Sequence, residues 1–333
     1  MKGDKIILPV NQTQIIRNDI NPKIDSVIIN RRNSLGFRGP EKPAGFANIL
    51  SIITVGGSTT ECHFLSEEKT WPYVLSQDLK PAYKDLWINN AGFDGHSTFG
   101  HQVLMNDYLV RIKPKIILFL AGINDIENNQ PSFHDKLNTK GAYADFKHFI
   151  FTNSEVLSVI LNFFRGWKAQ KMNNTTNAMW DLRRGEQLIL TEEEIDRTLR
   201  KQQKYLVDFR RRIEGLIDTC RSYSILPVFI TQPNQFGHGT DSITGVNLET
   251  YLLPNNLNGK ALWRVLELYN QNVKSICFER DVPVIDLANL LPKSSLYFYD
   301  GSHYTNQGAR KVASILAEQL KPLIWDKYPQ FIK

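Results

Sequence analysis

The sequence predicts an α/β protein in which a parallel sheet is covered by helices on both faces. Five apolar stretches have the length and the bounding turns of buried parallel strands. Helical patterns lie between these stretches and after them, and such alternation is typical of a doubly wound α/β sandwich with right-handed connections. The expected strands cover residues 49–55, 86–90, 116–121, 225–231 and 282–287.

Five helices are expected in the same part of the chain. The clearest is 191–220, where Thr191 and Glu194 have the spacing of a capping box and acidic residues occupy the first turn. Seven apolar residues recur along one face of it, as in a helix that packs on a core: Ile195, Leu199, Leu206, Phe209, Ile213, Leu216 and Ile217. The other helices are expected at 71–79, 101–112, 261–279 and 307–320.

Two segments lie outside this alternation. Residues 1–47 show little periodicity and are expected to form an extension that packs beside the core. The remaining domain, 48–333, contains an interval at about 127–190 that is too long for a simple connection, so it is expected to be a helical insertion. Within it, 149–167 is apolar but interrupted by polar residues, which favours a helix buried on the core or capping the site over an interfacial membrane helix.

Composition predicts a globular protein with a modest positive charge. The chain has 333 residues, 42% of them hydrophobic, which suffices for a substantial core. The net charge of +6 and the pI near 9.0 come from basic residues interleaved with acidic ones. Because no recognition motif accompanies the charge, no nucleic-acid partner is expected. An anionic glycan or a membrane surface stays open as a partner, membrane association is not predicted, and the oligomeric state is left open.

The cysteines and the seven histidines show no metal-ligand spacing, so neither a metal nor a cofactor is expected. Cys62, Cys220 and Cys277 are widely separated and odd in number, and they are expected to be buried packing residues. The apolar run at 6–10 is too short for a signal peptide or a membrane span. The expectation is a soluble, cytoplasmic protein, or a cell-envelope protein if a leader has been removed.

Ser58 stands where a strand is expected to end and a helix to begin, directly after Gly56 and Gly57. A serine at a helix N-terminus suits either a phosphate cradle or a nucleophile whose own N–H helps to hold an oxyanion. A Walker-type phosphate loop needs a lysine and a longer glycine loop, and this segment has neither. The nucleophile is therefore the favoured interpretation, beside that of an ordinary capped turn.

Two other expected strands also end in polar or glycine-rich segments. Asn124 offers an amide that can donate a hydrogen bond to a tetrahedral intermediate. The segment 90–98 contains glycines whose N–H groups can approach a ligand closely. Either segment could be an ordinary turn. Asp125 is expected to brace its turn, and His96 and His101 are candidates to line the cleft.

Asp300 and His303 are three residues apart, just before the last expected helix. This spacing lets the carboxylate reach the imidazole, fix its tautomer and stabilise the imidazolium that forms when a serine loses its proton. A lone histidine would more often be structural. Here it occurs together with Ser58, Asn124 and the glycine segment, each at a strand end, and this combination favours a serine esterase.

These segments resemble the four sequence blocks of the SGNH hydrolases, also called GDSL esterases and lipases. The first block, usually Gly-Asp-Ser, is present as 56–58, the third as 122–125 and the last, Asp-x-x-His, as 300–303. The glycine of the second block is placed at Gly95, with Gly92 as the fallback. The resemblance implies a three-layer α/β/α sandwich around a five-stranded, flavodoxin-like parallel sheet.

The resemblance covers about 49–320 and implies a role for each site residue. The triad would comprise a nucleophile, a general base that later acts as an acid, and its orienting partner: Ser58, His303 and Asp300. The oxyanion hole would consist of two backbone N–H groups and one side-chain amide: Ser58, Gly95 and Asn124. Gly57 replaces the usual aspartate of the first block, which is not a triad residue.

The function expected from the sequence is hydrolysis of a short acyl ester, most plausibly O-acetyl on a carbohydrate, through an acyl-enzyme on Ser58. The carbohydrate expectation rests on the run 36–39, Gly-Phe-Arg-Gly, which resembles bacterial family members associated with envelope glycans. Three alternatives stay open: an acyltransferase with the same triad, a lipid esterase whose insertion covers a fatty acyl chain, and a non-catalytic binding protein on this fold.

Overall fold

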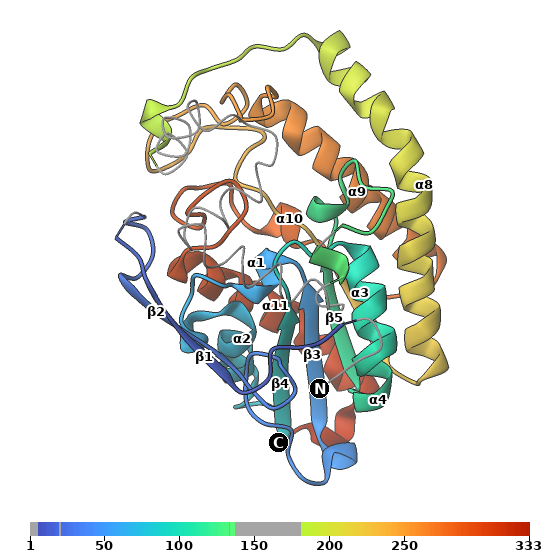
Figure 1. Cartoon of the computed structure of the whole chain (residues 1–333). Helices are drawn as coiled ribbons and strands as arrows, with labels where there is room; N and C mark the ends of the chain where they lie inside the picture. The colour runs from blue at the N-terminus through green and yellow to red at the C-terminus, as the bar shows by residue number, and fades with distance from the viewer. Residues whose placement is uncertain (1–5, 20, 133, 137–180) are drawn as a thin grey trace.

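The core of the molecule is a five-stranded parallel sheet in the order β4-β3-β5-β6-β7 (Figure 1). The computed structural model describes residues 6–19, 21–132, 134–136 and 181–333. The five strands occur where the sequence predicts them: β3 (Leu50–Gly56), β4 (Leu86–Gly92), β5 (Ile116–Ala121), β6 (Leu226–Thr231) and β7 (Val284–Ile285). The last strand is shorter than predicted, because Asp286 is already the N-cap residue of helix α10 (Leu287–Leu290).

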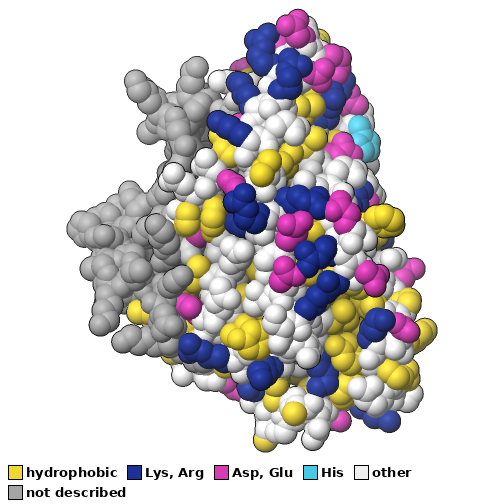
Figure 2. All heavy atoms as spheres, turned by 90° about the vertical axis from the view of Figure 1, so that its right-hand side faces the viewer, with side chains coloured by type: hydrophobic (Ala, Val, Ile, Leu, Met, Phe, Trp, Pro, Cys, Tyr) yellow, Lys and Arg dark blue, Asp and Glu magenta, His cyan; other side chains and the backbone are white. Residues whose placement is uncertain are grey.

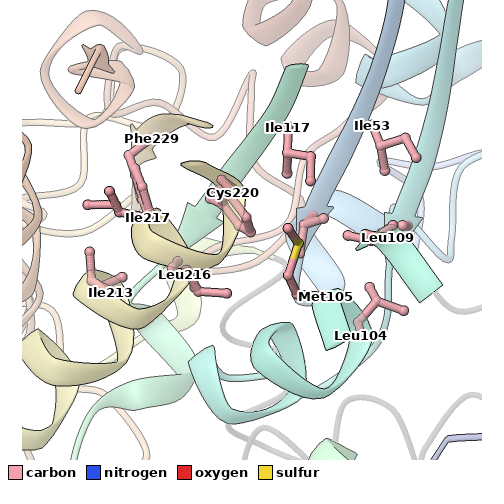
Figure 3. Close-up of a cluster of buried hydrophobic side chains, with 14 of the residues drawn as sticks. Ile53, Leu104, Met105, Leu109, Ile117, Ile213, Leu216, Ile217, Cys220 and Phe229 are labelled. Carbon is pink, nitrogen blue, oxygen red and sulfur yellow. The ribbon is translucent and has the colours of Figure 1, made fainter. Parts of the chain in front are cut away.

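Two apolar clusters, one on each face of the sheet, create a three-layer sandwich. Side chains alternate along β3, so Ile53 and Val55 enter one cluster while Leu50 and Ile52 enter the other. The first cluster, part of which is shown in Figure 3, is covered by α3 (Thr98–Leu104), α8 (Glu192–Ser222) and α9 (Gly259–Glu279). The second is covered by α2 (Trp71–Leu79) and α11 (Asn306–Lys327). The predicted α/β/α sandwich is therefore confirmed.

The helix predicted at 101–112 differs from the observed one in two ways. It begins earlier, at Thr98, because the Ser97 side chain accepts a hydrogen bond from a backbone N–H of the first turn. It also changes pitch, since α3 continues into a π-helical turn, η3 (Met105–Leu109), before α4 (Val110–Ile112). The Ser97 cap matters for the site, because it fixes the loop that follows β4.

Two long helices, α8 and α11, form where the sequence signals predict them. At the start of α8, Thr191 and Glu194 accept hydrogen bonds from each other's backbone N–H, which confirms the predicted capping box. Helix α11 extends beyond its predicted end, through Pro322, and buries Ile324 against the core. Its N-cap is Thr305, so the helix starts just after the predicted His303 segment.

The N-terminal segment forms a hairpin that no periodic pattern in the sequence predicts. Strand β1 (Gln12–Arg17) pairs antiparallel with β2 (Val27–Arg32). Five of the six residues of β1 are exposed and only Ile16 is buried, so the strand lacks the alternation that identifies a half-buried strand. Beyond the hairpin, Arg38 and Asn90 of β4 exchange two backbone hydrogen bonds of 2.9 and 2.8 Å. This bridge ties the N-terminal segment to the edge of the sheet.

The described parts of the expected insertion contain two short 3-10 turns, η5 (His134–Lys136) and η6 (Leu182–Arg184). The helix expected at 149–167 lies outside the described residues. Across the described ranges, no helix combines the length and the apolar character that crossing a membrane requires.

The outer face of α8 carries basic and acidic side chains side by side (Figure 2). Arg210 contacts two carboxylates, one on its own helix at Glu214 and one on α9 at Glu279. Arg197 likewise pairs with Glu193, one turn earlier. The interleaving of charges in the sequence therefore reflects a solvated helix face, where such pairs contribute little to stability.

Candidate active site

Ser58 is placed by the turn that leaves the central strand β3. The chain passes through Gly56 and Gly57 and enters α1 (Ser58–Glu61), a helix of four residues that begins at the serine itself. The N–H of a residue in the first turn has no partner within its helix, so it is available to a ligand. Ser58 is only 8% exposed, and its Oγ lies 2.8 Å from His303 Nε2.

His303 and Asp300 lie on the loop before α11 and complete a hydrogen-bonded chain with Ser58. His303 Nδ1 is 2.8 Å from Asp300 Oδ2, while the backbone N–H groups of Ser302 and His303 donate to Oδ1 at 2.8 Å each. Because an ionised carboxylate can only accept, the neutral imidazole carries its proton on Nδ1, and Nε2 accepts from Ser58. The Tyr299 ring stacks on the imidazole, with 5.5 Å between centroids. The predicted triad residues are thus brought together.

The charges around His303 favour the protonated imidazole. Burial disfavours the imidazolium, but the Asp300 carboxylate and its hydrogen bond outweigh burial, and the charges of Asp94 and Glu61 act in the same direction. The pKa of His303 is therefore raised above its ordinary value of 6.5. Burial alone would raise the pKa of Asp300. The positive charge of His303 and three hydrogen bonds to the carboxylate outweigh burial, so the pKa of Asp300 is lowered. Asp300 is consequently ionised at neutral pH.

Asn124 lies at the end of β5, beside Gly57 of the turn that carries Ser58. It lies on the 3-10 turn η4 (Ile123–Asp125), and its Nδ2 donates to the His96 carbonyl at 2.9 Å. A Cβ at position 57 would lie 2.3 Å from Asn124 Nδ2 and 3.2 Å from the same carbonyl oxygen. Gly57 is therefore required for this placement of the amide, which gives a physical reason for the missing aspartate of the first block.

Gly95 and Gly92 differ in whether their N–H groups are free to bind a ligand. The Gly92 N–H donates to Asn90 Oδ1 at 2.9 Å, so it is already occupied. Gly95 has a positive φ of 67°, and its N–H makes no hydrogen bond within the described parts of the chain. A Cβ at Gly95 would also lie 2.4 Å from the ring of His134. This geometry favours Gly95 over the fallback as an oxyanion donor.

The sequence profile of the GDSL-like lipase/acylhydrolase family matches residues 53–311, which is most of the chain. The chain belongs to this family. It is accordingly a hydrolase that acts on ester bonds, on an α/β fold with a flavodoxin-like sheet.

Two solved structures match this chain at low sequence identity. The acetylxylan esterase Axe2 from Geobacillus stearothermophilus is 12% identical, with a TM-score of 0.46, covering 82% of this chain and 94% of that one. A GDSL-like lipase from Bacteroides thetaiotaomicron is 9% identical, with a TM-score of 0.45, covering 86% and 93%. Among curated proteins, none matches significantly. These likenesses are too distant to bear on the substrate of this acylhydrolase.

Asp125 of this acylhydrolase braces the loop that carries Gly95. Its Oδ1 accepts from Thr98 N at 3.0 Å and lies 3.4 Å from Arg212 of α8. Burial raises the pKa of Asp125 to about 6, against the lowering effect of its Thr98 and Arg212 partners. Asp125 was expected to brace its own turn, but its carboxylate contacts Thr98 and Arg212 on other elements, and neither partner is revealed by sequence spacing.

Asp135 supports the same loop from the expected insertion and was not identified from the sequence. It is fully buried and accepts from Ser97 N at 2.8 Å, Gly100 N at 3.0 Å and Ser132 N at 2.8 Å. These bonds tie the start of α3 to the segment after β5. Another missed contact joins Thr59, next to the nucleophile, to Gln232 Oε1 at 3.2 Å. Neither partner carries a local sequence signal.

The two histidines considered as cleft residues are buried instead. His96 and His101 are each 1% exposed, and their rings lie 6.4 Å apart beneath the loop. Burial lowers the pKa of both to about 3, so both are neutral. The expectation was wrong because side-chain direction in this loop depends on packing against Phe93, 5.2 Å from the His96 ring. His96 contributes through its backbone carbonyl, which holds Asn124.

The three cysteines are buried, in agreement with their expected packing role. Burial raises the pKa of Cys62, the one nearest the nucleophile, to about 12, so its thiol is protonated. Within the ranges that the structure describes, no three His, Cys, Asp or Glu side chains are arranged to bind a metal ion.

Proposed function

We propose that the protein hydrolyses short acyl esters, in particular O-acetyl groups on a carbohydrate, through a covalent acyl-enzyme on Ser58. The observation that carries this proposal is the continuous chain of two 2.8 Å contacts from Ser58 Oγ through His303 to Asp300. A hydroxyl next to a base that is itself oriented by a carboxylate is the arrangement that activates a serine nucleophile.

In the first half of the proposed reaction, Ser58 Oγ attacks the ester carbonyl and its proton moves to His303 Nε2. The resulting oxyanion accepts hydrogen bonds from the N–H groups of Ser58 and Gly95 and from Asn124 Nδ2. Asp300 stabilises the imidazolium, which then donates its proton to the departing alcohol. In the second half, His303 Nε2 takes a proton from water as the water oxygen attacks the acyl carbonyl. The imidazolium then returns that proton to Ser58 Oγ as the acyl–oxygen bond breaks, which releases the acid and the free serine.

A panel of p-nitrophenyl esters from acetate to decanoate, assayed with wild type and Ser58→Ala, tests this function. Activity on short chains that Ser58→Ala lacks supports the deacylase, and activity that rises with chain length favours a lipid esterase. Turnover that an added alcohol diverts from hydrolysis to transfer identifies an acyltransferase. No turnover of any ester would contradict the proposal.

The carbohydrate preference rests on the run 36–39 and is tested by acetate release from acetylated glycans.

Asn124→Ala is expected to lower kcat for p-nitrophenyl acetate by about 10² to 10³-fold with little change in KM, because one oxyanion donor is lost. The Nδ2 already donates to the His96 carbonyl, so its second hydrogen remains for the oxyanion. Steady-state kinetics check this expectation. An unchanged kcat would remove Asn124 from the oxyanion hole.

The pH dependence of kcat/KM should show an acid limb governed by His303. The base must be neutral to accept the serine proton, so activity falls as pH falls through the pKa of His303. Since that pKa is raised above 6.5, the midpoint of the limb is expected above 6.5. A profile measured with p-nitrophenyl acetate, whose ester does not ionise, locates it. A flat profile down to about pH 5 would contradict a histidine base.

A further inference from the structure

The N-terminal segment reaches the far end of the nucleophile helix through one buried arginine. Helix α1 has only four residues, and its C-cap residue, Cys62, adopts the left-handed conformation at φ 53°. A helix this short is held by its surroundings rather than by its own hydrogen bonds. Its direction decides where Ser58 Oγ points, so the groups that bind its carbonyl end bear on the nucleophile.

Arg38 occupies that carbonyl end. Its Nη1 donates to Glu61 O at 2.8 Å and to Cys62 O at 2.7 Å, and its Nη2 donates to Leu65 O at 2.8 Å. Its Nε contacts Glu67 Oε2 at 3.0 Å, and the side chain is fully buried. A guanidinium presents these donors in a fixed planar fork, which a lysine cannot reproduce. The cation also lies at the negative end of the helix.

Arg38 is itself held rigidly. Its backbone pairs with Asn90, and Asn90 Nδ2 donates to Thr60 O of α1 at 2.8 Å. Gly39 lies so close to β4 that a Cβ would be 2.8 Å from Asn89 Nδ2, at a φ of 127°. Gly39, the final glycine of the run 36–39, is therefore required by the close approach to β4. That approach holds Arg38 beside α1.

A second arginine of the same segment holds the side chain of Glu61. Arg32 forms an ion pair with the Glu61 carboxylate and lies over the Phe93 ring, 4.7 Å from its centroid. Arg31, the preceding residue of β2, is exposed and makes no such contact with a described residue. Arg32 therefore contacts α1, whereas its neighbour Arg31 does not.

We propose that the N-terminal segment supports the active site. Arg38, together with Arg32, is a positioning residue that keeps Ser58 aligned with His303. This inference rests on the proposed role of Ser58 as nucleophile. The segment precedes residue 53, where the family match begins, so this support lies outside the matched region.

The test compares Arg38→Lys with Arg31→Lys, which makes the same change at the exposed neighbour. Ser58 reacts with a fluorophosphonate by forming an Oγ–P bond with loss of fluoride, and both the rate and the final stoichiometry of labelling are measured. Arg38→Lys is expected to label fully but about a hundredfold more slowly, because a shift of about 1 Å in a reacting group costs that much. The kcat for p-nitrophenyl acetate should fall by the same factor with little change in KM, while Arg31→Lys behaves as wild type.

Each other outcome has a definite meaning. Partial labelling at the wild-type rate means that Arg38 only maintains the folded fraction, which overturns the inference, as does full labelling at the wild-type rate. If Arg38→Lys does not fold, Arg32→Gln should show a smaller slowing at full stoichiometry, and a wild-type rate would overturn the inference. Absence of labelling at Ser58 in the wild type would instead overturn the proposed function itself.

Discussion

Replacing Ser58 by alanine should lower kcat for p-nitrophenyl acetate by about 10⁵ to 10⁶-fold, because no other group can form the acyl intermediate. The change removes one oxygen from a side chain that is 8% exposed, so the fold should be retained. Far-UV circular dichroism and the thermal midpoint check the fold, and stopped assays with high enzyme concentration measure the residual rate.

Ser76→Ala is the matched control. Ser76 is similarly buried, at 9% exposure, but it lies on α2, and its hydroxyl makes no hydrogen bond to a described residue. The Ser76→Ala variant should hydrolyse p-nitrophenyl acetate at the wild-type rate. Undiminished hydrolysis by Ser58→Ala would show that the nucleophile has been assigned to the wrong residue.

Asp300→Asn should lower kcat by about 10⁴-fold. An amide nitrogen facing His303 Nδ1 would donate to it, so the ring proton would move to Nε2, and that nitrogen could no longer accept from Ser58. The amide oxygen can still accept from the backbone N–H groups of Ser302 and His303, so the loop should keep its shape. The loss of the carboxylate also lowers the pKa of His303, which moves the acid limb to lower pH.

Asp281→Asn is the control for this isosteric change. Asp281 is exposed, lies before the segment that carries Asp300 and His303, and has a φ of 49°, a conformation that asparagine tolerates. Its kinetics should match the wild type. A loss of less than about tenfold in Asp300→Asn would mean that another group orients His303.

The sheet and most helices could be predicted because their signals are local. An apolar run such as β5 is buried on both sides, and the α8 capping box is complete within four residues. The β1–β2 hairpin could not be predicted, because β1 buries only Ile16 and so shows no alternation. Pattern analysis fails here for a physical reason, since the strand is held by its partner rather than by a core.

The triad could be predicted because Ser58, Asp300 and His303 occupy recognisable turns at strand and helix ends. Its supports could not, since they act across the fold: Asp135 contacts Ser97, 38 residues earlier, and Arg38 contacts Leu65, 27 residues later. His96 was misassigned for the same reason, because its burial follows from the packing of neighbouring elements. The sequence therefore singles out the three candidate residues, and the structure shows that they lie in contact and which groups hold them.

Mass spectrometry of the acid-quenched enzyme during turnover of p-nitrophenyl acetate tests whether Ser58 carries the acyl group. One acetyl group is expected on the peptide that contains Ser58, appearing with the burst of p-nitrophenol and absent from Ser58→Ala. An active enzyme with no acetyl group on Ser58, or with an acetyl group on another residue, would contradict this expectation.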